Sequence, residues 1–124
     1  MMPNRILIVE DTPENMYVLQ RVLRHRQFET LAAANGEEAI RKAEAEKPDL
    51  ILMDMRLPGL SGYEAAERIH QKLPALPIVA LTADALTGDR ERALEIGCVA
   101  YFSKPIHYEE VVTAIREILN GLKK

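Results

Sequence analysis

Five short apolar runs recur along the chain, and polar or turn-forming residues follow each of them. The clearest run is LILM at positions 50–53, which ends in Asp54 and shows no alternation of apolar and polar positions. An uninterrupted run of this length is typical of a strand that is buried on both faces of a parallel sheet. We therefore expect strands at 5–10, 29–33, 50–54, 78–82 and 99–102, of which 29–33 is the weakest.

Between these runs, apolar residues recur every three or four positions, which is the spacing of a helix with one buried face. Thr12 followed by Pro13 predicts a capped helix start, and Pro48 is expected to end the second helix. The pattern predicts a first helix that follows Thr12, a second at about 37–47, a third over 63–73, a fourth at 86–96 and a fifth that includes 111–122.

The fourth of these helices has the weakest apolar face. Its segment 87–92 is polar throughout, and the residues that can face a core are Leu86, Ala93, Leu94 and Ile96. This pattern predicts the most loosely held helix of the five. Gly97 is placed to end it as a left-handed cap.

Five strands that alternate with five helices predict an α/β fold, a parallel sheet wound on both faces, because right-handed crossovers place helices on each side. A chain of 124 residues is expected to form one domain, 1–124, and to bury a substantial core.

Composition narrows the functional classes. An apolar fraction of 48% and a charged fraction of 28% are ordinary for a globular protein, and the net charge of −3 without a basic block argues against direct binding of nucleic acid. We predict no membrane segment and no signal peptide, hence a cytoplasmic protein. The single cysteine, Cys98, excludes an internal disulfide and is expected to be a small buried hydrophobe.

Polar residues that burial does not explain follow four of the five predicted strands: Glu10 and Asp11, Asp54, Thr82, and Lys104. In the strand order 2-1-3-4-5 of many doubly wound sheets, these residues flank the crevice between strands 1 and 3. Three carboxylates at one edge repel each other by about 1 kcal/mol per close pair even at the dielectric constant of water. A hard cation such as Mg²⁺, which binds carboxylates and phosphate oxygens, would offset that repulsion.

A metal, the ammonium of Lys104 and the hydroxyl of Thr82 together make a site for a phosphoryl group. Asp54 is the expected nucleophile, whose carboxylate attacks phosphorus to give an acyl phosphate. Each residue alone has an ordinary structural explanation, for example Asp11 as a helix cap. Their occurrence together at matching strand ends favours a functional site.

These residues, the loop LPGLSG at 57–62 and the pairs Thr82-Ala83 and Lys104-Pro105 resemble the receiver domain of two-component response regulators, in its single-domain, chemotaxis-like form. The resemblance covers essentially the whole chain and implies the flavodoxin-like strand order 2-1-3-4-5. It implies a phosphoacceptor signalling domain rather than an enzyme. Its partners would be a sensor histidine kinase or histidine phosphotransfer protein and a downstream protein target, with a phosphorylation-dependent dimer as a further option.

The resemblance also implies roles for individual residues. Asp54 accepts the phosphoryl group, and Thr82 and Lys104 bind its oxygens. Tyr101 turns inward when Thr82 moves, which changes the surface formed by the fourth helix, fifth strand and fifth helix. The Lys104-Pro105 peptide is expected to be cis.

For the metal, the resemblance implies Mg²⁺, or Mn²⁺ in its place. Asp11, Asp54 and the backbone carbonyl of Arg56 would bind it directly, and Glu10 would bind it through a water.

The residues around the acceptor pocket are expected to tune how long the phosphoryl group lasts. We expect Arg56 and Asp84 to pair across the pocket mouth and to hinder hydrolytic water. Ala83 is small and leaves phosphodonors room to enter.

Three other functions are weighed against this one. A flavodoxin needs a hydroxyl- and glycine-rich phosphate loop where this chain has EDTPE at 10–14, and a haloacid-type phosphatase needs an aspartate where Arg56 stands. The serious alternative is a receiver-like scaffold that binds partners constitutively without phosphorylation.

Overall fold

The structure is a computed structural model that describes residues 3–82 and 88–122. Its strands are β1 (Arg5–Val9), β2 (Glu29–Ala33), β3 (Leu50–Asp54), β4 (Ile78–Thr82) and β5 (Ala100–Ser103). Its helices are α1 (Pro13–His25), α2 (Gly36–Glu46), α3 (Gly62–Lys72), α4 (Asp89–Glu95) and α5 (Tyr108–Leu122). The strands are parallel and lie in the order β2-β1-β3-β4-β5, which confirms the predicted fold.

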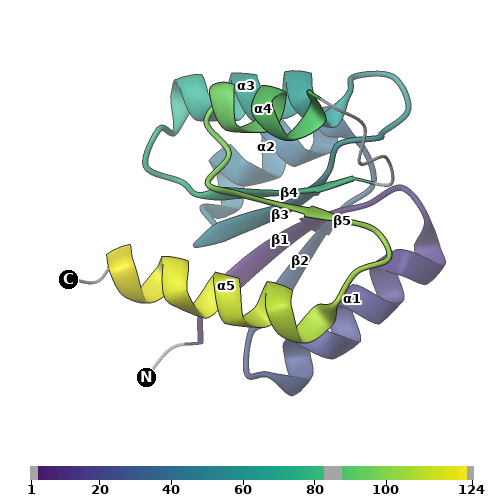
Figure 1. The fold of residues 1–124 in the computed structure, drawn as a ribbon, viewed down its shortest axis with the longest axis vertical. Helices are drawn as coiled ribbons and strands as arrows, with labels where there is room; N and C mark the ends of the chain where they lie inside the picture. The colour runs from purple at the N-terminus through teal and green to yellow at the C-terminus, as the bar shows by residue number, and fades with distance from the viewer. Residues whose placement is uncertain (1–2, 83–87, 123–124) are drawn as a thin grey trace.

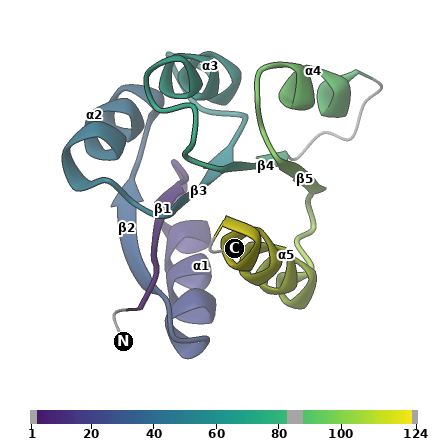
Figure 2. The ribbon, with the colours of Figure 1, turned by 90° about the vertical axis from the view of Figure 1, so that its left-hand side faces the viewer.

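Helices cover both faces of the sheet. α1 and α5 lie on one face, and α2, α3 and α4 lie on the other (Figures 1 and 2). Successive residues of a central strand therefore enter two different cores: Leu50 and Leu52 belong to the cluster on the α1 and α5 side, and Ile51 and Met53 to the other. Two covered faces explain why the strands show no apolar alternation.

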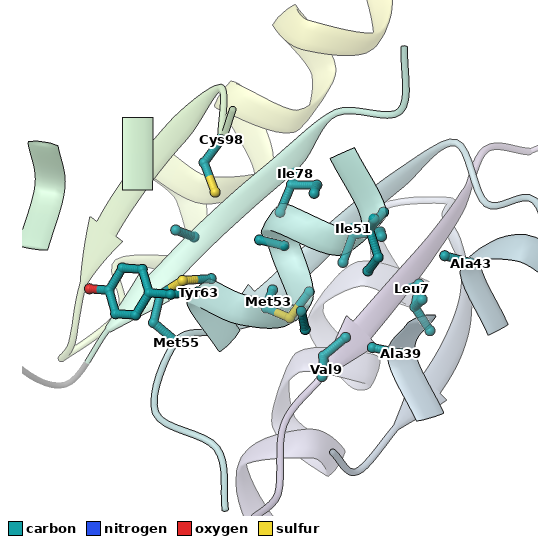
Figure 3. Close-up of a cluster of buried hydrophobic side chains, with 14 of the residues drawn as sticks. Leu7, Val9, Ala39, Ala43, Ile51, Met53, Met55, Tyr63, Ile78 and Cys98 are labelled. Atoms are coloured by element: carbon teal, nitrogen blue, oxygen red, sulfur yellow. The ribbon is translucent and has the colours of Figure 1, made fainter. Parts of the chain in front are cut away.

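Figure 3 shows the cluster beneath α2, α3 and α4, where Met53, Met55 and Tyr63 lie near one another. None of the helices within 3–82 and 88–122 is long and apolar enough to span a membrane.

The helix ends follow the sequence signals with small differences. α1 begins at Pro13 with Thr12 in the N-cap position, but the Thr12 side chain makes no capping hydrogen bond. α2 begins at Gly36, one residue earlier than expected, because the side chain of Asn35 accepts a hydrogen bond from the Glu38 amide and caps it.

The structure corrects the prediction for α4, which spans Asp89–Glu95, whereas positions 86 and 87 lie outside the described residues. Ala93 is buried as expected, but the prediction that Leu94 faces a core was wrong, since it is 43% exposed. Adjacent residues of a helix point about 100° apart, so Leu94 cannot share the inward direction of Ala93. Gly97 has a φ of 111°, the left-handed conformation that was predicted.

Cys98 is buried, and burial raises the pKa of its thiol to about 12. We expect it to react with a thiol reagent at neutral pH at least about 100-fold more slowly in the native protein than after denaturation, since the thiolate is the reactive form. Timed alkylation with and without denaturant, followed by mass spectrometry, measures the ratio. Equal rates would contradict the burial of this side chain.

Candidate functional site

The carboxyl ends of β1 and β3 bring three carboxylates together. Glu10, Asp11 and Asp54 each offer an oxygen, and these oxygens all lie within 4.8 Å of one another. Val9 pairs with Met53 in the sheet, so the residues that follow them come side by side. Glu10 and Asp54 are buried, at 2% and 3% exposure, whereas Asp11 is exposed. The acids therefore meet at one edge of the sheet, as their positions after the strands indicated.

Lys104 brings a positive charge into this cluster. Its Nζ lies 3.1 Å from Glu10 Oε1 and 3.1 Å from Asp54 Oδ2, and its backbone amide donates to the Thr82 carbonyl at 2.7 Å. Burial alone would lower the pKa of Lys104, but the hydrogen bonds and charges of Asp54 and Glu10 outweigh it and raise the pKa above its ordinary value. The ammonium is therefore charged at neutral pH.

The second oxygen of each buried carboxylate is held by a backbone amide. The Thr12 amide donates to Glu10 Oε2 at 3.1 Å, and the Arg56 amide donates to Asp54 Oδ1 at 2.9 Å. These bonds fix the two carboxylates in the orientation in which their other oxygens face Lys104. Thr12 thus contributes its backbone to the site in place of the side-chain cap that was expected.

The remaining expected side chains lie on β4 and β5. Thr82 is fully buried at the end of β4, and Tyr101 packs half-buried against the core on the α4 side. The Lys104–Pro105 peptide bond is cis, the geometry that the resemblance implies.

Ala83 and Asp84 lie outside the described residues. The expected pairing of Arg56 with Asp84 and the role of Ala83 therefore stay predictions.

Gly62, at the start of α3, lies directly against the backbone that carries Asp54. A Cβ added at this position would lie 2.3 Å from the Asp54 carbonyl oxygen and 2.5 Å from Met55 Cα. The Gly62 amide donates to the Met55 carbonyl at 3.1 Å. Only a residue without a side chain lets α3 come this close, so Gly62 fixes the path of the loop after the acceptor. The sequence marked this glycine as part of a motif but gave no physical reason for it.

Asp89 and Tyr63 are polar residues whose position beside the site the sequence did not indicate. Asp89 Oδ2 lies 3.7 Å from a guanidinium nitrogen of Arg56. Tyr63 is 6% exposed, with the guanidinium of Arg92 stacked 4.1 Å from the centre of its ring. The apolar pattern could not identify Asp89, because it belongs to a run of polar residues that is typical of a solvated helix.

The side chains suit a divalent cation. Carboxylate oxygens are the ligands that Mg²⁺ prefers, and Glu10, Asp11 and Asp54 provide them at one point. Three carboxylates against the ammonium of Lys104 leave this cluster with a net charge of −2. A doubly charged cation would neutralise that charge.

Residues 6–116 match the family model described as the response regulator receiver domain. The chain belongs to this family of signalling phosphoacceptor domains, and its acidic pocket is typical of a phosphoacceptor site. Over its length it is similar to the polar-differentiation response regulator DivK of Brucella anthropi, with 39% identity over 120 residues that make up 95% of this chain and 98% of that protein.

Solved structures of related proteins are similar to this chain in both sequence and fold. The receiver domain of the sensor histidine kinase PA1611 from Pseudomonas aeruginosa PAO1 is 39% identical, with a TM-score of 0.87 over 95% of this chain and 98% of that one, and it holds a magnesium ion in its active site cleft. The response regulator TrrA from Thermotoga maritima, in complex with Mg²⁺ and BeF, is 30% identical with a TM-score of 0.86 over 93% and 98% of the two chains. The acidic site of the present chain is consistent with the same metal.

Proposed function

We propose that the protein is a phosphorylation-activated receiver of a two-component system or phosphorelay, in which Asp54 accepts a phosphoryl group from a phosphohistidine. The observation that carries this proposal is the setting of Asp54: a buried carboxylate that shares Lys104 with Glu10 and lies beside Asp11. The phosphohistidine would belong to a sensor histidine kinase or a histidine phosphotransfer protein.

In the transfer step, a carboxylate oxygen of Asp54 attacks phosphorus. The new O–P bond forms while the N–P bond breaks, and the electron pair of that bond returns to the histidine ring. Lys104 already contacts Asp54 Oδ2, so its ammonium is placed to bind the oxygens of the incoming group, together with the hydroxyl of Thr82. Both donors act by stabilising negative charge rather than by covalent chemistry.

A Mg²⁺ or Mn²⁺ ion would be held by Asp11, Asp54 and the backbone carbonyl of Arg56, and through a water by Glu10. The chemistry that it supplies is neutralisation of the charge shared by the acids and the phosphoryl group. The excess of carboxylates over ammonium groups in the cluster supports this assignment.

The histidine-bearing partner would approach along α1. A groove of about 350 Å³ lies between α1 and the segment after β5, and its lining includes Asn15, Leu19 and Pro105 in addition to Glu10 and Lys104 of the acidic site. A partner helix laid in this groove would bring its phosphohistidine to Asp54. Met16, half-buried on α1, is a further candidate for this contact.

The response to phosphorylation would pass through Thr82 and Tyr101 to the surface made by α4, β5 and α5. Thr82 ends β4 and pairs in register with Ser103 of the neighbouring β5, the strand that carries Tyr101. A shift of Thr82 toward the phosphoryl group would act on β5 at Ser103, two residues beyond Tyr101. The altered surface would bind a downstream protein or a second phosphorylated copy.

The test is phosphorylation by acetyl phosphate, followed by the mass of the intact chain. We expect the mass of one phosphoryl group to be gained only when Mg²⁺ is present and only when Asp54 is intact, so Asp54→Ala should abolish the gain. Glu67→Ala, which removes an exposed carboxylate of α3, serves as the matched control and should phosphorylate normally. A folded wild-type protein that binds Mg²⁺ but gains no mass from acetyl phosphate or a phosphorylated histidine partner would favour the constitutive scaffold instead.

A further inference from the structure

A polar cavity of about 280 Å³ lies between the loop after β3 and the helix α4. Its polar lining comes from Arg56, Ser61, Tyr63, Asp89 and Arg92. The acceptor-site side chains of Asp54, Thr82 and Lys104 are not among those that line it. The cavity is therefore a neighbour of the phosphorylation site, and Arg56 connects the two.

Arg56 belongs to both places because its backbone and its side chain have different partners. Its amide is bonded to Asp54 Oδ1, which fixes the backbone beside the acceptor. Its guanidinium lies 3.7 Å from Asp89 Oδ2, on the first turn of α4. The Arg56 side chain is 53% exposed, so its guanidinium stays in contact with water when it changes rotamer.

Asp89 is the less mobile member of this ion pair. Its side chain is 20% exposed, and its Oδ2 atom is buried without a hydrogen bond among the described residues. A partly buried carboxylate of this kind is stabilised by a nearby cation. Arg92 lines the same cavity, so Asp89 keeps a cationic neighbour if Arg56 moves away.

Tyr63, which lines the same cavity, adds no charge to it. Its hydroxyl is buried without a hydrogen bond within the described part of the chain, and in Figure 3 it points away from the labelled side chains of the hydrophobic cluster. Burial, with a contribution from the charge of Asp89, raises the pKa of Tyr63 to about 12. The phenol is therefore neutral in the physiological range, which leaves Asp89 as the fixed anion of this cavity.

We propose that Asp89 is a positioning residue that competes with the phosphoryl group on Asp54 for the guanidinium of Arg56. This inference rests on the proposed function. Phosphorylation places a second and more highly charged anion close to the backbone of Arg56. In the ion pair with Asp89, Arg56 is drawn toward α4, and with the phosphoryl group it covers the acceptor pocket.

The competition affects hydrolysis of the acyl phosphate. In that step a water molecule attacks phosphorus and the O–P bond to Asp54 breaks. Inorganic phosphate leaves, the carboxylate of Asp54 is restored, and the attacking water releases a proton to the solvent. Arg56 over the phosphoryl group hinders the approach of that water. Asp89, which draws Arg56 aside, therefore shortens the life of the phosphorylated state.

The experiment phosphorylates the protein with acetyl phosphate, removes the acetyl phosphate and follows the loss of the phosphoryl mass over time. Asp89→Asn should lengthen the half-life by roughly two- to fivefold, the range that corresponds to one partly exposed ion pair. Arg56→Ala should shorten it, and the double variant should decay like Arg56→Ala alone. Asp89→Glu should restore the wild-type half-life, and Glu91→Gln, which removes an exposed charge from the same turn of α4, should leave it unchanged.

Thermal unfolding of every variant shows that the compared proteins are folded. An unchanged or shorter half-life in Asp89→Asn would overturn the inference, as would a longer half-life that persists when Arg56 is also removed. These outcomes differ from failure of the proposed function, in which the wild-type chain takes no phosphoryl group at all. That result would overturn both.

Discussion

Lys104→Met should lower the rate at which the chain gains a phosphoryl group by about 100-fold or more, the usual effect of removing one charge-stabilising donor. Methionine fills a similar volume but has no charge, so the phosphoryl oxygens lose the ammonium that now lies 3.1 Å from Asp54 Oδ2. Rates of phosphorylation by acetyl phosphate at saturating Mg²⁺, read from intact mass, measure the effect. A loss of less than tenfold would show that Lys104 does not carry this role.

The same substitution should also change stability. It leaves the buried carboxylates of Glu10 and Asp54 without their cation, which we expect to cost about 2–3 kcal/mol at pH 7, less than for a pair sealed from water because Lys104 is 24% exposed. In the wild type the pKa of Lys104 is raised, so its ion pairs contribute fully to the free energy of unfolding at neutral pH. This contribution is lost only as the pH rises through the pKa of Lys104 in the folded protein.

Urea unfolding at several pH values and Mg²⁺ concentrations measures this difference. Lys72→Met is the matched control, because Lys72 is 61% exposed and forms a surface ion pair of 2.8 Å with Glu44. Its effect should be smaller than about 1 kcal/mol. Equal losses of unfolding free energy in the two variants would mean that the ion pairs of Lys104 stabilise the protein no more than an exposed ion pair does.

Gly62→Ala should destabilise the protein by about 3 kcal/mol, the upper part of the range for overpacking. The added methyl group would meet the backbone of Asp54 and Met55 at 2.3 and 2.5 Å, and a backbone cannot turn aside as a flexible side chain can. Either α3 or the loop that carries Arg56 must move. Phosphorylation should therefore slow down even under conditions in which the variant is folded.

Denaturant unfolding and the rate of phosphoryl gain test this prediction together. Gly121→Ala is the matched control, because a Cβ added there meets nothing within 4 Å. It should be neutral or slightly stabilising, as alanine is the better helix former. A Gly62→Ala protein as stable as the wild type would show that the approach of α3 to the loop has room to relax.

Much of the fold was predictable because the period of the apolar pattern distinguishes the two kinds of element. The run at 50–53 is uninterrupted because β3 is covered on both faces, and the sequence shows this directly. The acidic site was predictable for a related reason. Residues at the carboxyl ends of neighbouring parallel strands must meet. Once the family resemblance supplied the strand order, Glu10 and Asp54 could therefore be placed together without knowing any side-chain contact.

Contacts that depend on how two helices or loops approach could not be predicted in this way. Asp89 meets Arg56 because of where α4 lies over the loop after β3, and no periodicity records that placement. The close approach of Gly62 is likewise a property of the loop path. Thr12 illustrates the limit of local signals, since it occupies the cap position without making the capping bond.

The parallel sheet has a consequence for the order in which the site is assembled. Strands that pair in parallel must be joined by long crossovers. Each pair of neighbouring strands in this sheet can therefore form only after a long segment of chain has been closed into a loop. Lys104 is 94 residues from Glu10 and 50 from Asp54. During synthesis, the acids therefore emerge long before the lysine that contacts them. The pocket is complete only when the segment after β5 has reached the ends of β1 and β3, so competence to receive a phosphoryl group reports that the first and last strands of the chain are both in place.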